Sequence, residues 1–388
     1  MLSDPVAVVR GAHLDRCQRA PADRPRARIC VLTEELSGAP DEGRKKFALA
    51  LADALARQQH AVSLVATRGS AASLLPGARL APAPSTFLSR GLAAELRQSR
   101  PDVIFYVATA STTVMAFVRS RALKAMCPTA AVVLLGLQAR RHGRLARRAI
   151  RYLRPDLVCV QAPDSQRYLE QLGCSVRLLP SGVDAHTFCP VAPERRRELR
   201  SRYGLRLDAP TVLHVGHLKA GRGIRRLAEL SSGGACQVVL VTSSSTPRDL
   251  ELARELQLAG VTVRTQYEPY VEQLYQLADC YVFPVESTDN AIEVPLSVLE
   301  AFACDLPVVT SRFGGLPRLF GGANCPGLAF VDSTAALVEA ATRLARCPQR
   351  GTRPLALPYS WEAIASRLLE EALPSSATAR IKEEENRA

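Results

Sequence analysis

Aromatic residues are scarce in this chain of 388 residues, where phenylalanine, tyrosine and tryptophan together make up 5%. Proteins that bind single-stranded nucleic acid stack the bases on aromatic side chains, so we expect no nucleic-acid partner. Long apolar runs are also missing. The longest apolar-rich stretch, VIFYVATASTTVMAFV, is interrupted by Ser and Thr and is shorter than a membrane-spanning helix.

The chain has eleven cysteines but no C-x-x-C pair. Cys30 and Cys159 lie inside the apolar runs ARICVL and DLVCVQ, as expected for small buried side chains in a reducing compartment. A zinc site needs closer Cys and His spacing, so we expect no metal. The N-terminal stretch has acidic residues and no apolar core typical of a signal peptide. We therefore expect a cytoplasmic protein, at most attached to the inner face of the membrane.

The formal net charge is +13, carried mostly by arginine. Such an excess favours an acidic partner, such as a membrane surface, a nucleic acid or a polyphosphate ligand. An arginine-rich solvated surface explains it equally well. Apolar and charged residues, at 47% and 22%, are in the range of globular proteins.

Apolar runs of strand length alternate with segments of helical spacing in both halves of the chain, which predicts an α/β fold with two doubly wound parallel sheets facing a cleft. The Pro-, Ser- and Gly-rich stretch RLLPSGVDAHTFCP separates the halves. We predict five segments: an irregular segment 1–25, a Rossmann-like domain 26–183, a second Rossmann-like domain 184–360, a terminal helix 361–375 that packs back on the first domain, and a disordered tail 376–388.

The stretch EVPLSVLEAFACDLPVVTSRFGG combines two carboxylates with an apolar run. Glu293 and Glu300 are seven residues apart, and Pro295 between them is typical of a helix start. Free backbone N–H groups at a helix N-terminus bind anions. The pattern therefore predicts a phosphate-bearing ligand, with carboxylates that hold its hydroxyls.

Five stretches of the second half resemble the retaining glycosyltransferases of family 4. They are LPSGVDAHTFCP, VLHVGHLKAGRGIRRL, LYQLADCYVFPVES, LSVLEAFACDLPVVTS and the pair Gly314–Gly315, and together they span roughly residues 176–325. The resemblance implies a GT-B fold and a metal-independent enzyme without a cofactor. Such an enzyme, of hexosyltransferase type, moves a sugar from a nucleotide-diphosphate-sugar to an acceptor.

The resemblance matches the two glutamates unequally, because only one of them occupies a position of a family glutamate. Glu300 matches the family glutamate that holds the donor ribose. Glu293 lies one position after the slot of the other family glutamate, which Ile292 occupies, and Pro295 offers no N–H to the diphosphate. Either Glu293 still contacts the donor sugar, or this contact has moved to Asp289, Asn290 or Glu286.

The loop GHLKAGRG resembles the family loop whose cations neutralise the departing diphosphate. Arg222 and His217 occupy the two cationic positions, and we predict both, with Glu293, as catalytic residues. The further predicted donor-binding residues are Lys219, Gly216, Leu296, Gly314 and Gly315. Gly38, Gly43 and His142 are the weaker candidates for the acceptor side of the cleft; a plain turn and a packed histidine explain them as well.

The segment ARRHGRLARRAIRYLR, residues 139–154, has the spacing of a basic amphipathic helix. An anionic membrane surface could bind its arginine face, and an ordinary surface helix is the alternative. That face comprises Arg140, Arg144, Arg147, Arg148, Arg151 and Arg154.

We predict a glycosyltransferase whose partners are a nucleotide sugar and an acceptor glycan or glycolipid, such as a lipid-linked or surface-polysaccharide precursor. The alternatives are a nucleotide-sugar epimerase or phosphorylase on the same fold, or a degenerate nucleotide-sugar-binding scaffold.

Overall fold

The computed structural model describes residues 27–36, 38–67, 79–80, 87, 89–138, 140–244 and 249–373, with the backbone alone for 79–80. The predicted irregular segment 1–25 and the predicted disordered tail 376–388 lie outside the described residues.

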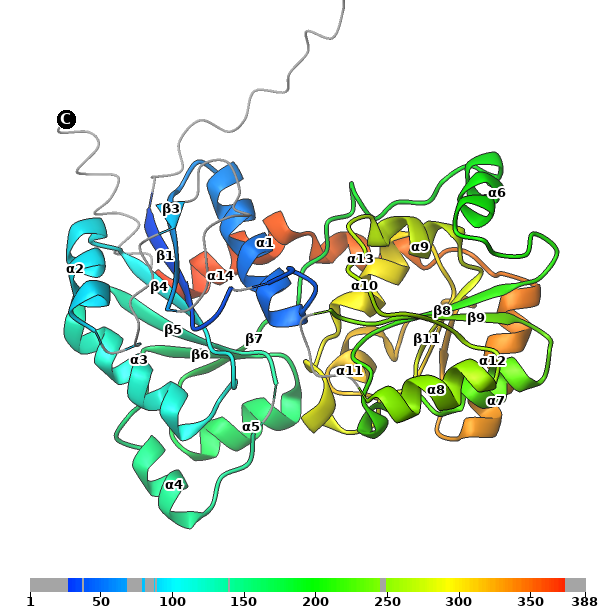
Figure 1. The fold of residues 1–388 in the computed structure, drawn as a ribbon. Coiled ribbons are helices and arrows are strands. Elements are labelled where there is room, and N and C mark those ends of the chain that lie inside the picture. Colours follow the sequence, from blue (N-terminus) through cyan, green and yellow to red (C-terminus); the bar gives the residue numbers. More distant parts are fainter. Residues whose placement is uncertain are drawn as a thin grey trace, which may run out of the picture.

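The N-terminal domain is built on a parallel sheet of seven strands in the order β3-β2-β1-β4-β5-β6-β7 (Figure 1). Its strands are β1 (Arg28–Thr33), β2 (Ala61–Ala66), β3 (Arg79–Leu80), β4 (Val103–Val107), β5 (Ala131–Gly136), β6 (Leu157–Val160) and β7 (Val176–Leu178). The C-terminal domain has a parallel sheet of six strands in the order β10-β9-β8-β11-β12-β13. Its strands are β8 (Thr211–Val215), β9 (Gln237–Val241), β10 (Thr262–Arg264), β11 (Cys280–Phe283), β12 (Val308–Thr310) and β13 (Leu328–Phe330).

Helices cover both faces of each sheet. They are α1 (Gly43–Arg57), α2 (Arg90–Ser99), α3 (Val114–Met126), α4 (Arg144–Ile150), α5 (Pro163–Gln171), α6 (Pro193–Arg202), α7 (Arg226–Ser232), α8 (Leu250–Leu258), α9 (Val271–Leu277), α10 (Leu296–Ala303), α11 (Leu316–Phe320), α12 (Thr334–Arg346), α13 (Arg353–Ala356) and α14 (Trp361–Ala372), with single turns η1 (Ala220–Arg222), η2 (Thr288–Asn290) and η3 (Leu357–Tyr359). Several helix starts are set by the sequence, because a Ser or Thr side chain accepts a hydrogen bond from the backbone N–H three residues on. Ser89, Thr113, Ser333 and Ser360 do so.

The apolar strand runs divide between the two faces of their sheet. Ile29 and Val31 of β1 pack in a core with α1 and α14, whereas Cys30 and Leu32 pack in a second core with α2, α3 and α5. This alternation follows from the two-residue period of a strand. Burial raises the pKa of the Cys30 thiol to about 12, as expected for a cysteine that acts as a small apolar side chain.

The chain passes between the domains twice. The backbone N–H of Val183 donates to the carbonyl oxygen of Tyr359 at 2.8 Å, so the two connecting segments, one leaving and one returning to the N-terminal domain, lie side by side. The returning chain enters α14, which packs on α1 of the N-terminal domain (Figure 1). The Phe47 and Trp361 rings meet edge to face with centroids 5.1 Å apart.

The strand order reverses between β1 and β4 in the first sheet and between β8 and β11 in the second. Loops at the carboxyl ends of strands at such switch points bind ligands in open α/β sheets. The predicted fold class, with two doubly wound parallel sheets, is confirmed.

Two sequence-based expectations differ from the structure. The predicted basic helix 139–154 is shorter, because α4 begins only after Gly143 and ends at Ile150. The short strands β3 and β7 were not predicted, since two or three residues show no periodicity. Within the described ranges, none of the helices has the length and apolar character needed to cross a bilayer.

Candidate active site

A cleft of about 670 Å³ lies between the two domains. Its walls come mainly from three segments: residues 40–46 after β1, residues 215–222 after β8 and residues 289–300 between β11 and α10. All three follow strands at the switch points of the two sheets. The position of the cleft is therefore a direct consequence of the strand order.

Arg222 is a buried cation in the cleft wall, only 6% exposed. Its Nη1 donates to the carbonyl oxygen of Asn290, whereas its Nε has no hydrogen-bond partner. No carboxylate among the described residues forms an ion pair with it. Burial lowers its pKa to about 10, which still leaves it charged at neutral pH. A buried, carboxylate-free arginine at a cleft wall is suited to bind an anion.

His217 also lines the cleft, but as a neutral group. Burial, helped by the nearby charge of Arg222, lowers its pKa to about 4. We expected it to share the cationic role of Arg222. At neutral pH it can instead donate or accept a hydrogen bond, and the positive charge comes from Arg222 and the exposed Lys219.

His214, which sequence reasoning missed, lies on β8 beside Arg222. Its Nδ1 is 2.8 Å from the carbonyl oxygen of Val282, so Nδ1 carries the proton and Nε2 is a lone-pair acceptor without a partner. Burial and then Arg222 lower its pKa to about 3. Gly216 has to be glycine at this point, because an added Cβ would lie 2.8 Å from His214 Nε2 and 3.0 Å from Arg222 Nη2.

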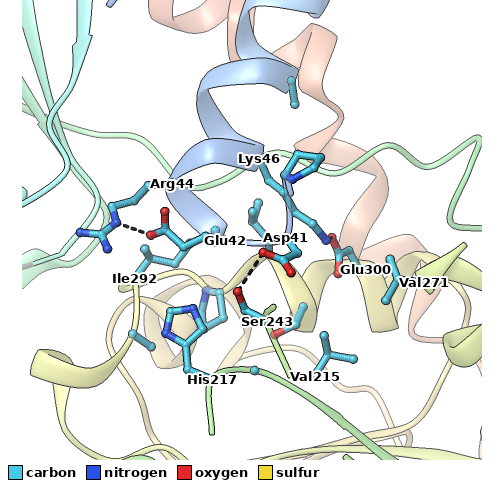
Figure 2. A pocket seen from close by; sticks show the side chains of 18 of the residues that line it. Asp41, Glu42, Arg44, Lys46, Val215, His217, Ser243, Val271, Ile292 and Glu300 are labelled. Carbon is cyan, nitrogen blue, oxygen red and sulfur yellow. Dashed lines mark hydrogen bonds and ion pairs between the residues drawn. The ribbon is translucent and has the colours of Figure 1, made fainter. Parts of the chain in front are cut away.

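Glu300 points into the cleft from α10, as Figure 2 shows. Its Oε2 accepts a hydrogen bond from the Tyr275 hydroxyl at 2.8 Å, and its Oε1 pairs with Lys46 Nζ of the other domain at 3.4 Å. Leu296, at the start of the same helix, lines the cleft as well. The predicted donor-binding residues Glu300, Leu296, Gly216 and Lys219 are thus brought together.

The charged segment after β1 forms the opposite wall (Figure 2). Asp41 accepts hydrogen bonds from Ser243 Oγ at 2.8 Å and from the Ser244 backbone N–H at 2.5 Å. Arg44 Nε donates to Glu42 Oε1 at 2.6 Å. We did not predict these residues. The sequence does hold a signal for them, because the charged run PDEGRKK begins seven residues after the end of the first strand.

Glu293 departs from its predicted role. It is 1% exposed and does not line the cleft, and its carboxylate accepts hydrogen bonds from Ser165 Oγ and the Gln161 backbone N–H. Ile292 faces the cleft instead, with its Cδ1 3.6 Å from where a Cβ on Gly43 would be (Figure 2). Ile292 and Glu293 are neighbours in the chain, but the chain bends at Glu293 and Val294, and the Glu293 carboxylate lies with Gln161 and Ser165 rather than at the cleft.

The three alternatives to Glu293 have different positions. Asp289 and Asn290 line the cleft, whereas Glu286 does not and pairs with Arg226.

Gly314 and Gly315 also lie outside the cleft wall. A Cβ on Gly314 would be 2.3 Å from the carbonyl oxygen of Glu293, and one on Gly315 would be 2.4 Å from that of Gln161. The lack of a side chain lets Gly314 pack closely on Glu293 within the C-terminal domain and lets Gly315 pack closely on Gln161 of the N-terminal domain. Of the acceptor-side glycines, Gly43 lines the cleft and Gly38 does not.

His142 is a packed histidine outside the cleft. Its Nε2 lies 2.7 Å from the Thr112 carbonyl oxygen, and its Nδ1 lies 2.9 Å from the Tyr168 hydroxyl. A carbonyl can only accept, so the proton is on Nε2. The same two contacts hold the chain in a loop before α4.

Arg140 belongs to the cleft rather than to the basic helix. It precedes α4, lines the cleft and lies 3.6 Å from Asp289 across it. The described part of the chain has no group of three or more His, Cys, Asp or Glu side chains that could hold a metal ion.

The family match lies within the C-terminal domain. Residues 209–347 match the family model described as Glycosyl transferases group 1. The D-inositol 3-phosphate glycosyltransferase of Xylanimonas cellulosilytica is 30% identical over 213 residues, which are 50% of this chain and 50% of that protein. The GDP-mannose-dependent alpha-(1-6)-phosphatidylinositol monomannoside mannosyltransferase of Mycolicibacterium smegmatis is 30% identical over 191 residues, 45% of this chain and 49% of that protein. The chain thus spans about half the length of the curated relatives it matches.

Solved structures resemble both domains together. The sucrose-phosphate synthase of Thermosynechococcus elongatus has a TM-score of 0.69 at 21% identity, covering 88% of this chain and 97% of that chain. The Anabaena protein HepE in complex with UDP has a TM-score of 0.66 at 15% identity, covering 88% of this chain and 98% of that chain. At these identities the likeness is one of fold, and it agrees with the two-domain GT-B architecture.

Proposed function

We propose that the protein is a retaining, metal-independent glycosyltransferase of family 4 that transfers a hexose from a nucleotide-diphosphate-sugar to a glycan or glycolipid. In this proposal the domain of residues 184–360 holds the donor and that of residues 26–183 holds the acceptor. The family match of residues 209–347 supports the assignment of the donor side.

The observation that carries the proposal is the state of Arg222. A cation so deeply buried without a carboxylate loses hydration that the one hydrogen bond to the Asn290 carbonyl oxygen replaces only in part. A diphosphate in the cleft would supply the missing negative charge beside this guanidinium. The same contact would strengthen as the glycosidic bond breaks and negative charge builds up on the leaving group, which is the electrostatic form of catalysis.

The neighbouring groups have compatible roles. Neutral His217 can donate a hydrogen bond to a phosphate oxygen, and Lys219 adds charge at the rim. Glu300, fixed by Tyr275, would accept hydrogen bonds from the ribose diol. We assign no protein nucleophile: the acceptor hydroxyl attacks from the side of the leaving diphosphate, which takes its proton.

A donor screen tests the proposal first. UDP-glucose and GDP-mannose are the first probes, because UDP and GDP-mannose occur in the names of the similar proteins. A donor should raise the melting temperature of the wild type and of Arg225→Ala, a matched exposed arginine paired with Glu255, and should raise that of Arg222→Ala by less.

Sugar release with and without candidate acceptors then separates transfer from hydrolysis and from binding alone. We expect acceptor-dependent sugar release that persists in the presence of EDTA. NMR should show that the product keeps the anomeric configuration of the donor. Binding without any release would identify a scaffold, and loss of activity with EDTA would contradict metal independence.

We further propose that α4 docks on anionic membrane, where a lipid-linked acceptor would be found. Leu145 is 87% exposed and Tyr152 is 76% exposed, and both lie beside exposed arginines. Cations beside exposed apolar side chains favour a negatively charged lipid surface, with about 1 kcal/mol per basic residue. The arginines concerned are Arg144, Arg147, Arg148 and Arg151.

Flotation with vesicles tests this membrane contact. Wild-type protein should bind phosphatidylserine-containing vesicles at low salt, lose binding as salt rises, and ignore neutral vesicles. Reversing the charge of the four arginines should abolish binding and leave activity on a soluble acceptor intact. Absence of wild-type binding at low salt would show that α4 is an ordinary surface helix.

A further inference from the structure

We propose that Glu293 is a positioning residue: its carboxylate caps helix α5 of the N-terminal domain from the C-terminal domain, and this contact sets the angle between the two domains. Glu293 and the groups around it form an interdomain joint, defined here as Gln161, Ser165, Ser181, Glu293 and Val294.

Helix α5 lacks a cap of its own. It begins after Ala162, whose side chain cannot accept a hydrogen bond from the first turn. The Glu293 carboxylate lies at this end of the helix, where Ser165 Oγ of the first turn donates to its Oε1 and the N–H of Gln161, just before the helix, donates to its Oε2 at 3.3 Å. The N-terminal end of a helix carries unpaired N–H groups and a partial positive charge, so a carboxylate stabilises it.

The rest of the joint connects the domains in the same place. Val294 N–H donates to Gln161 Oε1 at 2.9 Å, and Gln161 Nε2 donates to Ser181 Oγ at 2.9 Å. Ser181 Oγ in turn donates to the Val294 carbonyl oxygen at 2.7 Å. All of these side chains are buried. A different angle between the domains would break these bonds where water cannot readily replace them, and such losses are costly.

The joint is next to the point where the chain changes domain. Ser181 directly precedes Gly182 and Val183, and Val183 bonds to the returning chain at Tyr359. A short, buried contact beside the crossing point acts as a pivot, because the cleft walls lie farther from it and move more for the same rotation. The pairs Asp41–Ser243 and Lys46–Glu300 span the cleft and depend on this angle.

The chain contains a built-in reporter of the joint. Trp361 is the only tryptophan, and its ring packs against Gly182, where a Cβ would come within 2.5 Å of it. A rotation of the domains therefore changes the surroundings of this ring. Its fluorescence reports the angle without any ligand.

The test compares Glu293→Gln, Ser165→Ala and the double variant with two matched controls. Glu34→Gln removes the charge of a buried glutamate whose partners Tyr106, Thr109 and Arg119 all lie in the N-terminal domain. Ser120→Ala removes a buried serine that bonds only to its own helix. The measurements are the Trp361 emission maximum and the radius of gyration by small-angle scattering.

Both joint variants should shift the Trp361 emission to longer wavelength and increase the radius of gyration, and both controls should leave the two quantities at wild-type values. The double variant should match Glu293→Gln alone, because the two side chains act through one contact. Ser165→Ala is the milder change and keeps the test valid should Glu293→Gln fold poorly. Wild-type emission and size in both joint variants would overturn the proposal.

A kinetic arm rests on the proposed function. Misplaced domains should lower kcat by between about ten- and a hundred-fold, because small errors of alignment are costly in catalysis. The Kd for UDP or GDP, measured by calorimetry, should stay unchanged. A weaker Kd in Glu293→Gln but not in Ser165→Ala would place Glu293 at the ligand and overturn the positioning role. Should the wild type transfer no sugar, the proposed function fails, while the fluorescence and scattering results still decide the joint.

Discussion

Replacing Arg222 by an apolar side chain of similar length should separate function from stability. The pKa of Arg222 falls to about 10 through burial, which corresponds to about 3 kcal/mol of unfavourable free energy for the charged form. No ion pair within the described residues offsets it. Arg222→Met removes this cost.

The substitution also removes the hydrogen bond to the Asn290 carbonyl oxygen. Leaving that acceptor unpaired costs about 1–3 kcal/mol. The difference between these two terms gives the expected change in the free energy of unfolding. That of Arg222→Met should equal the wild-type value or exceed it by up to about 2 kcal/mol. Substituting a buried polar group usually lowers the stability of a protein, so the sign of the change in Arg222→Met is informative.

The pH dependence has a defined sign as well. The folded-state pKa of Arg222 lies below its ordinary value, so the folded protein gives up this proton before the unfolded chain does. The advantage of the substitution is therefore fully present below about pH 10 and shrinks above it.

Turnover should change much more than stability. Losing the cation that faces the leaving diphosphate should lower kcat by about 10²–10³-fold, with a smaller effect on the donor Kd. Urea unfolding at neutral pH and steady-state assays with the donor found in the screen measure the two quantities. Arg225→Met, at an exposed position paired with Glu255, is the control and should alter neither.

Two results would refute this reasoning. A loss of several kcal/mol in Arg222→Met would show that the arginine is a structural residue with a partner in the folded protein. Wild-type turnover in the same variant would show that the departing group does not lie against Arg222.

Three further predictions concern other residues of the cleft and the joint. The free energy of unfolding should fall as the pH drops from about 6.5 towards 4. Burial lowers the folded-state pKa values of His214 and His217 to about 3 and about 4. The unfolded chain therefore binds more protons than the folded protein in this pH range. In urea unfolding, the free energy of His214→Phe should fall less steeply with decreasing pH than that of the wild type. A wild-type free energy that does not change in this pH range would contradict the lowered pKa values. Glu300→Gln should weaken donor binding by about ten- to a hundred-fold in calorimetry, and unchanged affinity would remove its ribose role. Gly204→Ala, at φ +70° in open space, should lower the stability by about 1 kcal/mol. Gly314→Ala, at φ +52° with a carbonyl oxygen 2.3 Å from the new Cβ, should lower it clearly more. Equal losses of stability in thermal unfolding would argue against tight packing at Gly314.

The sequence by itself determined the architecture. Apolar runs alternating with helical spacing can bury their side chains only as parallel strands covered on both faces, so two doubly wound sheets follow from local pattern. Arg222 and Glu300 could be placed in the cleft because the stretches around them resemble motifs of the family. Each of these motifs is a short continuous stretch, so the resemblance is visible in the sequence without the fold.

Only the tertiary structure decided which residues cross between the domains. The direction of the Glu293 carboxylate depends on a helix that begins 130 residues earlier, at Pro163. Asp41 and Lys46 meet the C-terminal domain across still larger separations, of 202 and 254 residues, and Arg140 enters the cleft because α4 begins only after Gly143. Contacts between distant segments leave no periodic mark in either segment, since periodicity records only which face of its own element a residue occupies. The family motif predicted the right segment for Glu293 but not its orientation, because contacts with Ser165 and Gln161, far away in the sequence, set that orientation.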